Sequence, residues 1–282
     1  MNDTGILYLV GTPIGNLKDI TLRALEILSK VDMIAAEDTR HSKKLLEHYE
    51  IRKPLISYHQ HNAKERAELL VQKMLSGENI AVISDAGMPG ISDPGYWVVK
   101  EAIENKITIC PIPGASAAIS ALVVSGLSTD RFIFEGFLPR KKEELKRRLE
   151  SLSRETRTIV IYEAPHRIKQ TLRVCEDYFG LERHGVVARE LTKRFEEIRR
   201  GTLEELSQYF SERQIKGEFC LLIEGAEKIE VAKAEWWNGI TEREHVDLLI
   251  SRGLSTNDAI KEAAKIRNKP KREIYNDYHQ EK

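Results

Sequence analysis

Three loops of small residues follow short apolar segments in the first half of the chain. The first is Gly11-Thr-Pro-Ile-Gly-Asn16, directly after the apolar residues 6–10, and the others cover residues 84–95 and 111–117. Small side chains let a ligand approach the backbone, and loops at the carboxyl ends of parallel strands line one crevice. We therefore expect one small-molecule site, with simple turns as the alternative. The first loop matches neither GxGxxG nor GxxxxGK[ST], which argues against pyrophosphate binding.

Three clusters of acidic and basic residues also come directly after apolar segments. They cover residues 37–40, 162–167 and 189–193. Neighbouring acids and bases can hydrogen-bond a ribose or a phosphate, and they can shift one another's pKa for proton transfer. Structural ion pairs are the alternative for any single cluster. Together, the three clusters favour an enzyme that moves a proton beside a polar substrate.

Histidines and cysteines give no metal or thiol signature. His59 and His61 lie near His41 and His48, but no HExxH motif or Cys/His set accompanies them, so polar loop histidines are favoured over metal ligands. The cysteines are odd in number and far apart, with no CxxC pair. We expect no metal and no disulfide, as is typical of a reducing compartment.

Composition favours a folded protein without a charge bias. The chain has 282 residues, of which 41% are hydrophobic, and 44 basic residues balance 44 acidic ones. A polyanionic partner must therefore be bound by a local patch. Basic runs that could form one are Arg140-Lys-Lys142, Lys146-Arg-Arg148, Lys193-Arg194 with Arg199-Arg200, and Lys269 with Lys271-Arg272. The N-terminal residues have no signal-peptide pattern and no apolar run is long enough to span a membrane, so a cytoplasmic protein is expected.

Apolar segments alternate with segments of helical period, which is typical of βαβ units and of an α/β fold. We predict an α/β domain over residues 1–125, a second α/β domain over 126–228, and a small helical, helix-turn-helix-like tail over 229–282. Strands are expected at residues 6–10, 31–35, 56–58, 80–84, 107–111, 132–134, 158–162, 185–189 and 218–225. Helices are expected at residues 22–28, 43–50, 63–75, 96–104, 115–124, 141–152, 168–179, 203–210, 241–252, 256–267 and 272–278.

The loops and clusters, in this order, resemble the tetrapyrrole-methylase superfamily of class III S-adenosylmethionine-dependent methyltransferases. They resemble most closely its ribosomal branch, the ribosomal RNA small subunit methyltransferase I family. The resemblance covers roughly residues 5–225. It is carried by Val10-Gly-Thr-Pro-Ile-Gly-Asn-Leu17, Ala36-Glu-Asp-Thr-Arg40, His61-Asn62, Ser84-Asp-Ala-Gly87, Ile91-Ser-Asp-Pro-Gly95, Pro113-Gly114, Phe134-Glu-Gly-Phe-Leu-Pro139, Tyr162-Glu163, Pro165-His-Arg167 and Arg189-Glu-Leu-Thr-Lys193. Met88 and Ala164 depart from the family's usual Thr and Ser, but neither departure removes a charged group.

The resemblance implies a homodimer of two-domain α/β subunits that bind S-adenosylmethionine in a cleft between the domains. It also implies methyl transfer to the ribose 2′-oxygen of a cytidine in the decoding region of 16S rRNA. Two alternatives remain open at this point. One is a methylase of the same superfamily that acts on a tetrapyrrole precursor or another small molecule, and the other is a non-catalytic ribosome-assembly factor that keeps the fold.

Roles follow from the positions of residues in these motifs. The chemistry is assigned to Glu37, Asp38, Arg40, Glu190 and Lys193, with a glutamate or a lysine of lowered pKa as the proton acceptor. Cofactor contacts are assigned to Gly11, Thr12, Pro13, Ser84, Asp85, Met88, Ala115, Ser116, Tyr162 and Leu222, with the RNA entry as the alternative place for the first loop. RNA contacts are assigned to Asn62, His166, Arg167 and Arg189. The tail is expected to add a basic rRNA-binding patch, with dimer support or a structural cap as alternatives.

Overall fold

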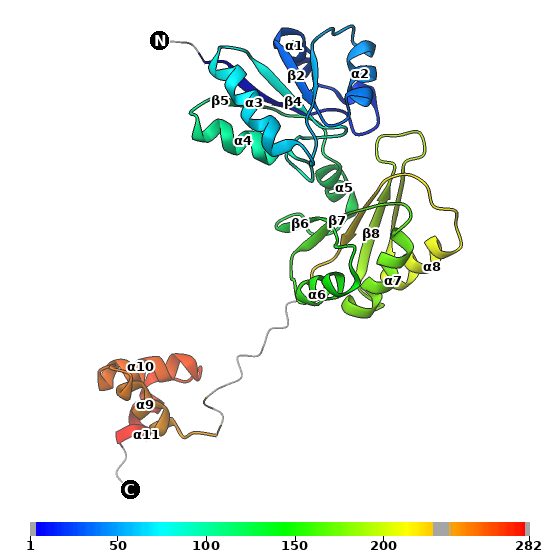
Figure 1. Cartoon of the computed structure of the whole chain (residues 1–282). Coiled ribbons are helices and arrows are strands. Elements are labelled where there is room, and N and C mark those ends of the chain that lie inside the picture. Colours follow the sequence, from blue (N-terminus) through cyan, green and yellow to red (C-terminus); the bar gives the residue numbers. More distant parts are fainter. Residues whose placement is uncertain (1–3, 228–236, 238, 280–282) are drawn as a thin grey trace. The chain divides into compact units, whose positions relative to one another are not determined.

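The computed structural model describes residues 4–227, 237 and 239–279, and the chain divides into two compact units, residues 1–226 and 227–282 (Figure 1). Of the regions treated in the sequence analysis, the N-terminal residues 1–3 and the boundary predicted between residues 228 and 229 lie outside the described part. The three-domain division therefore stays a prediction. No helix within the described part is long and apolar enough to cross a membrane.

The first unit begins with a five-stranded parallel sheet in the order β3-β2-β4-β1-β5. Alternate side chains of β4 (Ile80–Ile83) belong to different apolar clusters: Ile80 and Val82 pack with the helices α3 and α4, whereas Ala81 and Ile83 pack with α1. A strand that is buried on both faces has a continuous run of apolar residues, and this run predicts the strand from the sequence. The other elements are β1 (Ile6–Val10), η1 (Leu17–Asp19), α1 (Leu22–Lys30), β2 (Met33–Ala36), α2 (Thr39–His48), β3 (Leu55–Ser57), α3 (Ala63–Leu75), α4 (Gly95–Glu104), β5 (Thr108–Ile112) and α5 (Ala117–Ser125).

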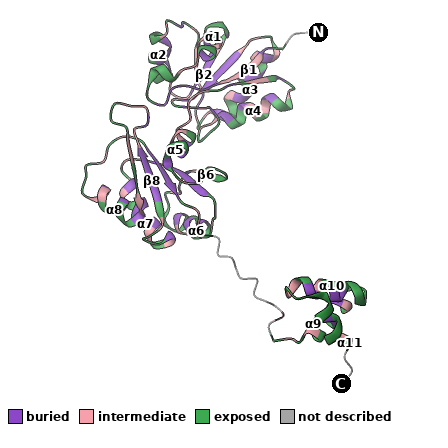
Figure 2. Cartoon of the chain, turned by 180° about the vertical axis from the view of Figure 1, so that it is seen from behind, coloured by how far each residue is buried: buried purple, intermediate pink, exposed green. Residues whose placement is uncertain are grey.

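A second five-stranded sheet follows, in the order β6-β7-β10-β8-β9, with β6 and β7 parallel and the other pairs antiparallel. The purple strands in Figure 2 show that its centre is buried. One face packs on helices, and the other packs on α5 and on Ile14 of the first loop. The elements are β6 (Phe132–Phe137), α6 (Lys142–Leu152), β7 (Thr158–Glu163), α7 (Ile168–Phe179), β8 (His184–Arg189), β9 (Glu197–Thr202), α8 (Leu203–Ser211) and β10 (Phe219–Ile223). The fold is α/β, as predicted.

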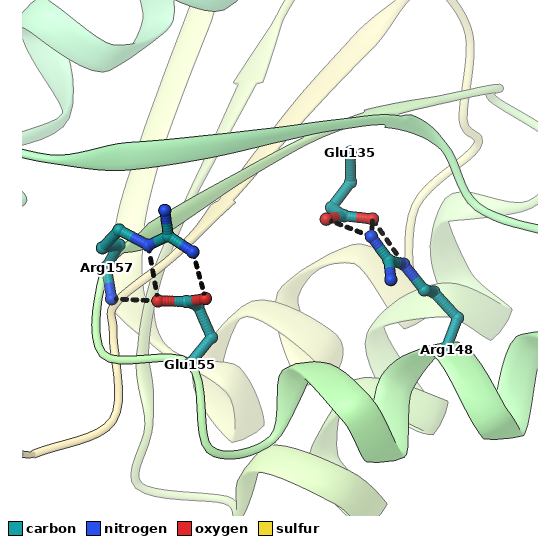
Figure 3. A network of polar contacts seen from close by, with 4 residues as sticks. All are labelled: Glu135, Arg148, Glu155 and Arg157. Carbon is teal, nitrogen blue, oxygen red and sulfur yellow. Dashed lines mark hydrogen bonds and ion pairs between the residues drawn. The ribbon is translucent and has the colours of Figure 1, made fainter.

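Two bidentate arginine–glutamate pairs lie at β6 and just before β7 of this second sheet (Figure 3). Arg148 of α6 donates from Nε and Nη2 to the two carboxylate oxygens of Glu135 on β6, at 2.6 and 2.7 Å. Arg157 binds Glu155 in the same bidentate way just before β7, at 2.8 and 2.7 Å, and its hydrogen bonds lower the pKa of Glu155 to about 2. These pairs hold α6 and the start of β7 in place, away from the loops described below.

The structure differs from the sequence prediction at β9 and at two helix starts. Residues 197–202 were not predicted as a strand, because their side chains are polar and the strand pairs only with β8 at the sheet edge. Helix α2 begins at Thr39 rather than at residue 43, since the Asp38 carboxylate caps it by accepting from the Arg40 amide. Helix α5 begins at Ala117 rather than at residue 115.

The second unit is a bundle of three helices, α9 (Glu242–Ser251), α10 (Thr256–Ile266) and α11 (Lys271–His279). Capping hydroxyls start the first two of them: Thr241 forms a capping box with Glu244, and Ser255 accepts from the Asp258 amide. The unit has its own apolar core, made of Val246, Leu249, Ala259, Ile260, Ala263, Ala264 and Ile274.

Candidate cofactor and substrate site

The three small-residue loops meet, as the sequence predicted. Gly11 of the first loop lies against Gly114 of the third loop and Met88 of the second. A Cβ added to Gly11 would lie 2.7 Å from Cα of Gly114 and 2.8 Å from Sδ of Met88. Only glycine permits backbones to approach this closely. The loops at the ends of β1, β4 and β5 are therefore packed into one surface.

Thr12 and Ser84 hold the first two loops together from within. The backbone of Thr12 exchanges hydrogen bonds with Gly87, at 2.9 and 3.1 Å, and its Oγ1 donates to the carbonyl of Ser84 at 3.1 Å. The Ser84 hydroxyl donates to the carbonyls of Ala86 and Gly87, both at 3.2 Å. Both side chains are buried. They fix the loop backbone, and we expect any contact of theirs with a ligand to come from that backbone.

Tyr162 connects the third loop to the second sheet. The amide of Ala118, near the start of α5, donates to the Tyr162 hydroxyl at 3.1 Å, and the Tyr162 ring packs edge-on against Phe134 and Phe137. Burial raises the pKa of Tyr162, so the hydroxyl stays neutral. Leu222 of β10 is fully buried in the apolar cluster that also contains Ile14 and Tyr162. Leu222 therefore lies in the packing behind the loops.

Glu37 lies near two carboxylates of the second loop, Asp85 and Asp93. With Tyr58, Ser84 and Asp93 it lines a narrow crevice that has no room for a water molecule. Burial raises the pKa of Glu37, and the negative charges of Asp85 and Asp93 raise it further. Asp93 is held by the amides of Gly90 and Gly95, and burial raises its pKa too. A carboxylate with a raised pKa is suited to accept a proton near neutral pH.

The carboxylate of Asp38 has the opposite pKa shift to that of Glu37. Arg40 donates to Asp38 from its amide, from Nε and from Nη2, at 2.8, 3.1 and 2.7 Å. These side-chain and backbone hydrogen bonds hold the pKa of Asp38 well below its usual range, so Asp38 is a poor proton acceptor. The amide of Asp38 donates to Asp85 at 3.0 Å. The Arg40 side chain is 88% exposed, which leaves its guanidinium accessible to a phosphate.

Glu190 and Lys193 form a charged turn after β8. Lys193 Nζ lies 2.8 Å from Glu190 Oε1 and 2.9 Å from Glu218 Oε2. Burial alone lowers the pKa of Lys193, but the two carboxylates outweigh it and the net pKa is raised. For Glu190, burial alone raises the pKa, but hydrogen bonds from Lys193 and the Glu218 amide make the net shift a lowering. The prediction of a lysine with a lowered pKa as proton acceptor is therefore wrong for Lys193.

Backbone strain accompanies this turn. Glu190 and Thr192 have φ values of 51° and 67°, in the left-handed region that non-glycine residues rarely adopt. The turn reaches the first loop, since a Cβ on Gly15 would collide with the Lys193 side chain. The buried Thr192 hydroxyl has no hydrogen-bond partner within the described structure. The Lys193 side chain therefore brings this turn into contact with the first loop.

The four residues assigned to RNA have unequal access. Arg167 donates to the carbonyls of Leu138 and Pro139 at 3.1 and 3.2 Å, and Arg189 to the carbonyl of Lys216 at 2.7 Å. Asn62 forms the turn before α3, where its Oδ1 accepts from the His59 amide and its Nδ2 donates to the Ser57 carbonyl. His166 is exposed in the turn before α7.

Sequence reasoning assigned no role to Asp93, Glu218 and Thr192. Asp93 lies in the second loop, whose Asp-Pro-Gly turn is the signal that could have indicated it. Glu218 directly precedes β10 and meets Lys193 only through the fold, since 25 positions separate them. No local sequence pattern could have paired them. Within the described residues, no group of three or more His, Cys, Asp or Glu side chains is arranged to hold a metal ion.

Comparisons with known proteins identify the family of the chain. The family model of the Tetrapyrrole (Corrin/Porphyrin) Methylases matches residues 6–207. Ribosomal RNA small subunit methyltransferase I of Bacillus subtilis (strain 168) is 50% identical over 279 residues, 99% of this chain and 95% of the relative. The protein of the same name from Synechocystis sp. (strain PCC 6803) is 50% identical over 271 residues, 96% of each chain.

Solved structures with the same fold include diphthine synthase, with a TM-score of 0.61 and 16% identity over 78% of this chain and 90% of that one. Uroporphyrin-III-C-methyltransferase from Thermus thermophilus has a TM-score of 0.53 and 20% identity over 78% of this chain and 94% of that one. At these identities the likeness concerns the fold alone. The sequence matches are far closer, and the chain belongs to the tetrapyrrole methylases and, within them, to the ribosomal RNA small subunit methyltransferase I family.

Proposed function

We propose that the protein transfers a methyl group from S-adenosylmethionine to the ribose 2′-oxygen of a cytidine in the decoding region of 16S rRNA, within the small ribosomal subunit in the cytoplasm. The observation that carries this proposal is the 50% identity, over 99% of the chain, to a relative named ribosomal RNA small subunit methyltransferase I. The ribose oxygen as acceptor is supported by Glu37, a half-buried carboxylate whose pKa is raised beside the loops.

The residues at the joined loops fit the cofactor. S-adenosylmethionine, when bound, supplies an electrophilic methyl group on a sulfonium sulfur. The site offers closely packed glycine backbones and the partly exposed side chain of Met88, which suit a ligand with a flat base that lies against the loop backbone. We propose that the residues that hold it are Gly11, Thr12, Pro13, Ser84, Asp85, Met88, Ala115, Ser116 and Tyr162, with Leu222 packed behind them.

Glu37 is the proposed proton acceptor. It takes the proton of the ribose 2′-hydroxyl as that oxygen is methylated. Its raised pKa makes the carboxylate a stronger base for this proton transfer. Arg40 anchors a neighbouring phosphate through its exposed guanidinium. Glu190 and Lys193 place a fixed pair of charges next to the first loop and orient the ribose. Orientation of the two reactants supplies much of the rate.

RNA contacts around this centre divide into exposed and internal ones. We propose that His166 contacts RNA directly, since it is the exposed member of the four residues assigned to RNA. Arg189 also pairs with Glu197 at 3.2 Å, so its guanidinium is shared between internal acceptors and the surface. Arg167 and Asn62 shape the loops that carry the contacts.

A methyl-transfer assay tests the reaction. Labelled S-adenosylmethionine is supplied with small ribosomal subunits from cells that lack this activity, with protein-free 16S rRNA, and with a tetrapyrrole such as uroporphyrinogen III. We expect label in RNA, and more label in assembled subunits than in free RNA. Label in the tetrapyrrole and none in RNA would overturn the proposal and favour the small-molecule alternative.

We also propose that the protein is a homodimer that forms through α5. This helix is apolar on every side, and its outward residues Ile119, Val123 and Val124 are 46%, 67% and 39% exposed. Valine and isoleucine in a row on one surface are typical of an interface. A second copy of the chain is the occupant that the family resemblance implies.

Light scattering after size exclusion tests the dimer. The wild-type chain should elute at twice its mass of 32.3 kDa, and Val123→Glu should elute as a monomer because a buried charge at an apolar interface has no partner. Leu22→Glu is the matched control, since Leu22 is 87% exposed on α1 and should leave the dimer intact. A monomeric wild type, or a dimer that survives Val123→Glu, would contradict the assignment.

A further inference from the structure

Helices α10 and α11 of the C-terminal unit form a helix-turn-helix. Residues 267–270 connect them, and Asn268 turns the chain with a left-handed φ of 49°. Helix α9 packs on both, and Ile260, Ala263 and Ile274 lie in the shared core. A short turn with one left-handed residue, between two helices that both pack on a third helix, is typical of this motif. In the nucleic-acid-binding versions, the second helix carries the contacts, and here that is α11.

One face of α11 carries side chains suited to RNA. At 100° per residue, Lys271, Arg272, Tyr275, Asn276 and His279 lie within one sector of the helix, away from the buried Ile274. Tyr275 is 45% exposed, and its ring lies 4.4 Å from that of His279. The sector thus offers two cations, an amide and an accessible aromatic ring. Asp277 projects from a different side of the helix.

Most described acidic side chains of the C-terminal unit are bound within the unit, whereas several of its basic side chains are not. Of the described acidic side chains, Glu242, Glu244, Asp247, Asp258 and Glu273 each bind a lysine, a hydroxyl or a backbone amide of the unit, whereas Glu262 and Asp277 form no ion pair with any described residue. The exposed cations Lys261, Lys265, Lys271 and Arg272 form no ion pair with any described residue. Two cations in the first turn of α11 also oppose the helix dipole, so they do not stabilise the helix. Their placement suits an external polyanion.

We propose that the α10–α11 corner binds an unpaired stretch of RNA, with Lys265, Lys271 and Arg272 on phosphates and Tyr275 stacked on a base. An unpaired strand is favoured because a ring that projects from a helix needs an accessible base face, which a duplex does not offer, and because the major groove of duplex RNA is too narrow for a helix. The inference rests on the proposed function, since it makes this corner a second binding site for the rRNA substrate.

Fluorescence anisotropy with the full chain and a labelled 20-nucleotide oligouridine RNA tests the corner. The pair Lys271→Ala/Arg272→Ala should weaken binding about 10-fold and reduce the slope of log affinity against log salt by about 1.4, since each phosphate contact on a single strand contributes about 0.7. Tyr275→Ala should weaken binding about 10-fold with the slope unchanged, and Tyr275→Phe should restore binding because stacking needs only the ring.

Matched controls show whether a loss of RNA affinity comes from the lost contacts, from the change in net charge or from a loss of folded protein. Lys64→Ala/Lys100→Ala removes the same charge from α3 and α4 and should leave oligouridine affinity within twofold. Thermal melts should match the wild type for every variant. Unchanged affinity in the Lys271/Arg272 and Tyr275 variants would overturn the inference. Equal or tighter binding to a 20-base-pair DNA duplex would also overturn it, because the corner would then be a duplex reader.

Steady-state methyl transfer separates this inference from the proposed function. On small subunits the corner variants should raise KM about 10-fold with kcat unchanged, since they act on substrate binding and not on the reacting atoms. If the wild type transferred no methyl to RNA, the proposed function would fail while the oligouridine result still stood. If methyl transfer succeeded and the corner variants kept wild-type KM and affinity, only the inference would fail.

Discussion

Glu37→Gln should lower kcat for methyl transfer to small ribosomal subunits about 1,000-fold, the middle of the range that general bases contribute. Glutamine keeps the shape of the side chain but cannot take the ribose proton. The affinity for S-adenosylmethionine should stay within twofold, because Glu37 is assigned to the acceptor oxygen. Single-turnover assays give the rate, and calorimetric titration gives the affinity.

The pH profile gives an independent readout of Glu37. Burial and the charges of Asp85 and Asp93 raise the pKa of Glu37, and the acceptor must be unprotonated. The wild-type rate should therefore fall as pH drops through this raised pKa, whereas the residual rate of Glu37→Gln should be flat over the same interval. Glu47→Gln is the matched control, because the Glu47 side chain is exposed on α2 with Oε1 3.7 Å from Lys43 Nζ, and it should keep wild-type turnover. Retained turnover in Glu37→Gln would show that another group accepts the proton.

Arg167→Ala should lower the free energy of unfolding by about 3 kcal/mol. Its partner Glu163 has a side chain with 0% exposure, and Arg167 Nε lies 3.5 Å from it. Without Arg167 the buried carboxylate keeps only the Thr171 hydroxyl and the Ala164 amide, at 2.6 and 2.8 Å. Two further hydrogen bonds, to the carbonyls of Leu138 and Pro139, are lost as well. Urea denaturation at neutral pH measures the change.

Two comparison variants show whether the loss comes from the buried pair. Arg173→Ala removes an exposed arginine of the same helix and should change stability by less than about 0.5 kcal/mol. Glu163→Gln/Arg167→Met removes both charges and should recover part of the loss. If Arg167→Ala unfolded like the wild type yet bound RNA more weakly, Arg167 would be a phosphate anchor, as the sequence motif alone suggested.

The fold was largely predictable, because buried strands consist of apolar residues and closely packed loops consist of small ones. Strand β4 is apolar along its whole length because helices cover both of its faces. The loops after β1, β4 and β5 are rich in small residues because their backbones lie in contact. Strand β9, Glu-Ile-Arg-Arg-Gly-Thr, was missed because an edge strand needs no apolar run.

The electrostatics of the site were less predictable, since they depend on partners far apart in the sequence. Glu37 gains its raised pKa from burial and from carboxylates of the second loop, and Lys193 gains its second carboxylate from Glu218. The motif placed both residues near the substrate, but only the fold shows that one is suited to accept a proton and the other is not. The same holds for Arg167, whose motif suggested RNA and whose contacts are internal.

The position of the methyl group on the RNA tests the central claim most directly. Small subunits methylated by the wild-type protein are digested to nucleosides and analysed by mass spectrometry, and the RNA is mapped for bonds that resist alkali. We expect 2′-O-methylcytidine at one alkali-resistant bond in the decoding region, and none after reaction with Glu37→Gln. A methyl group on the base, or on a ribose outside the decoding region, would contradict this prediction.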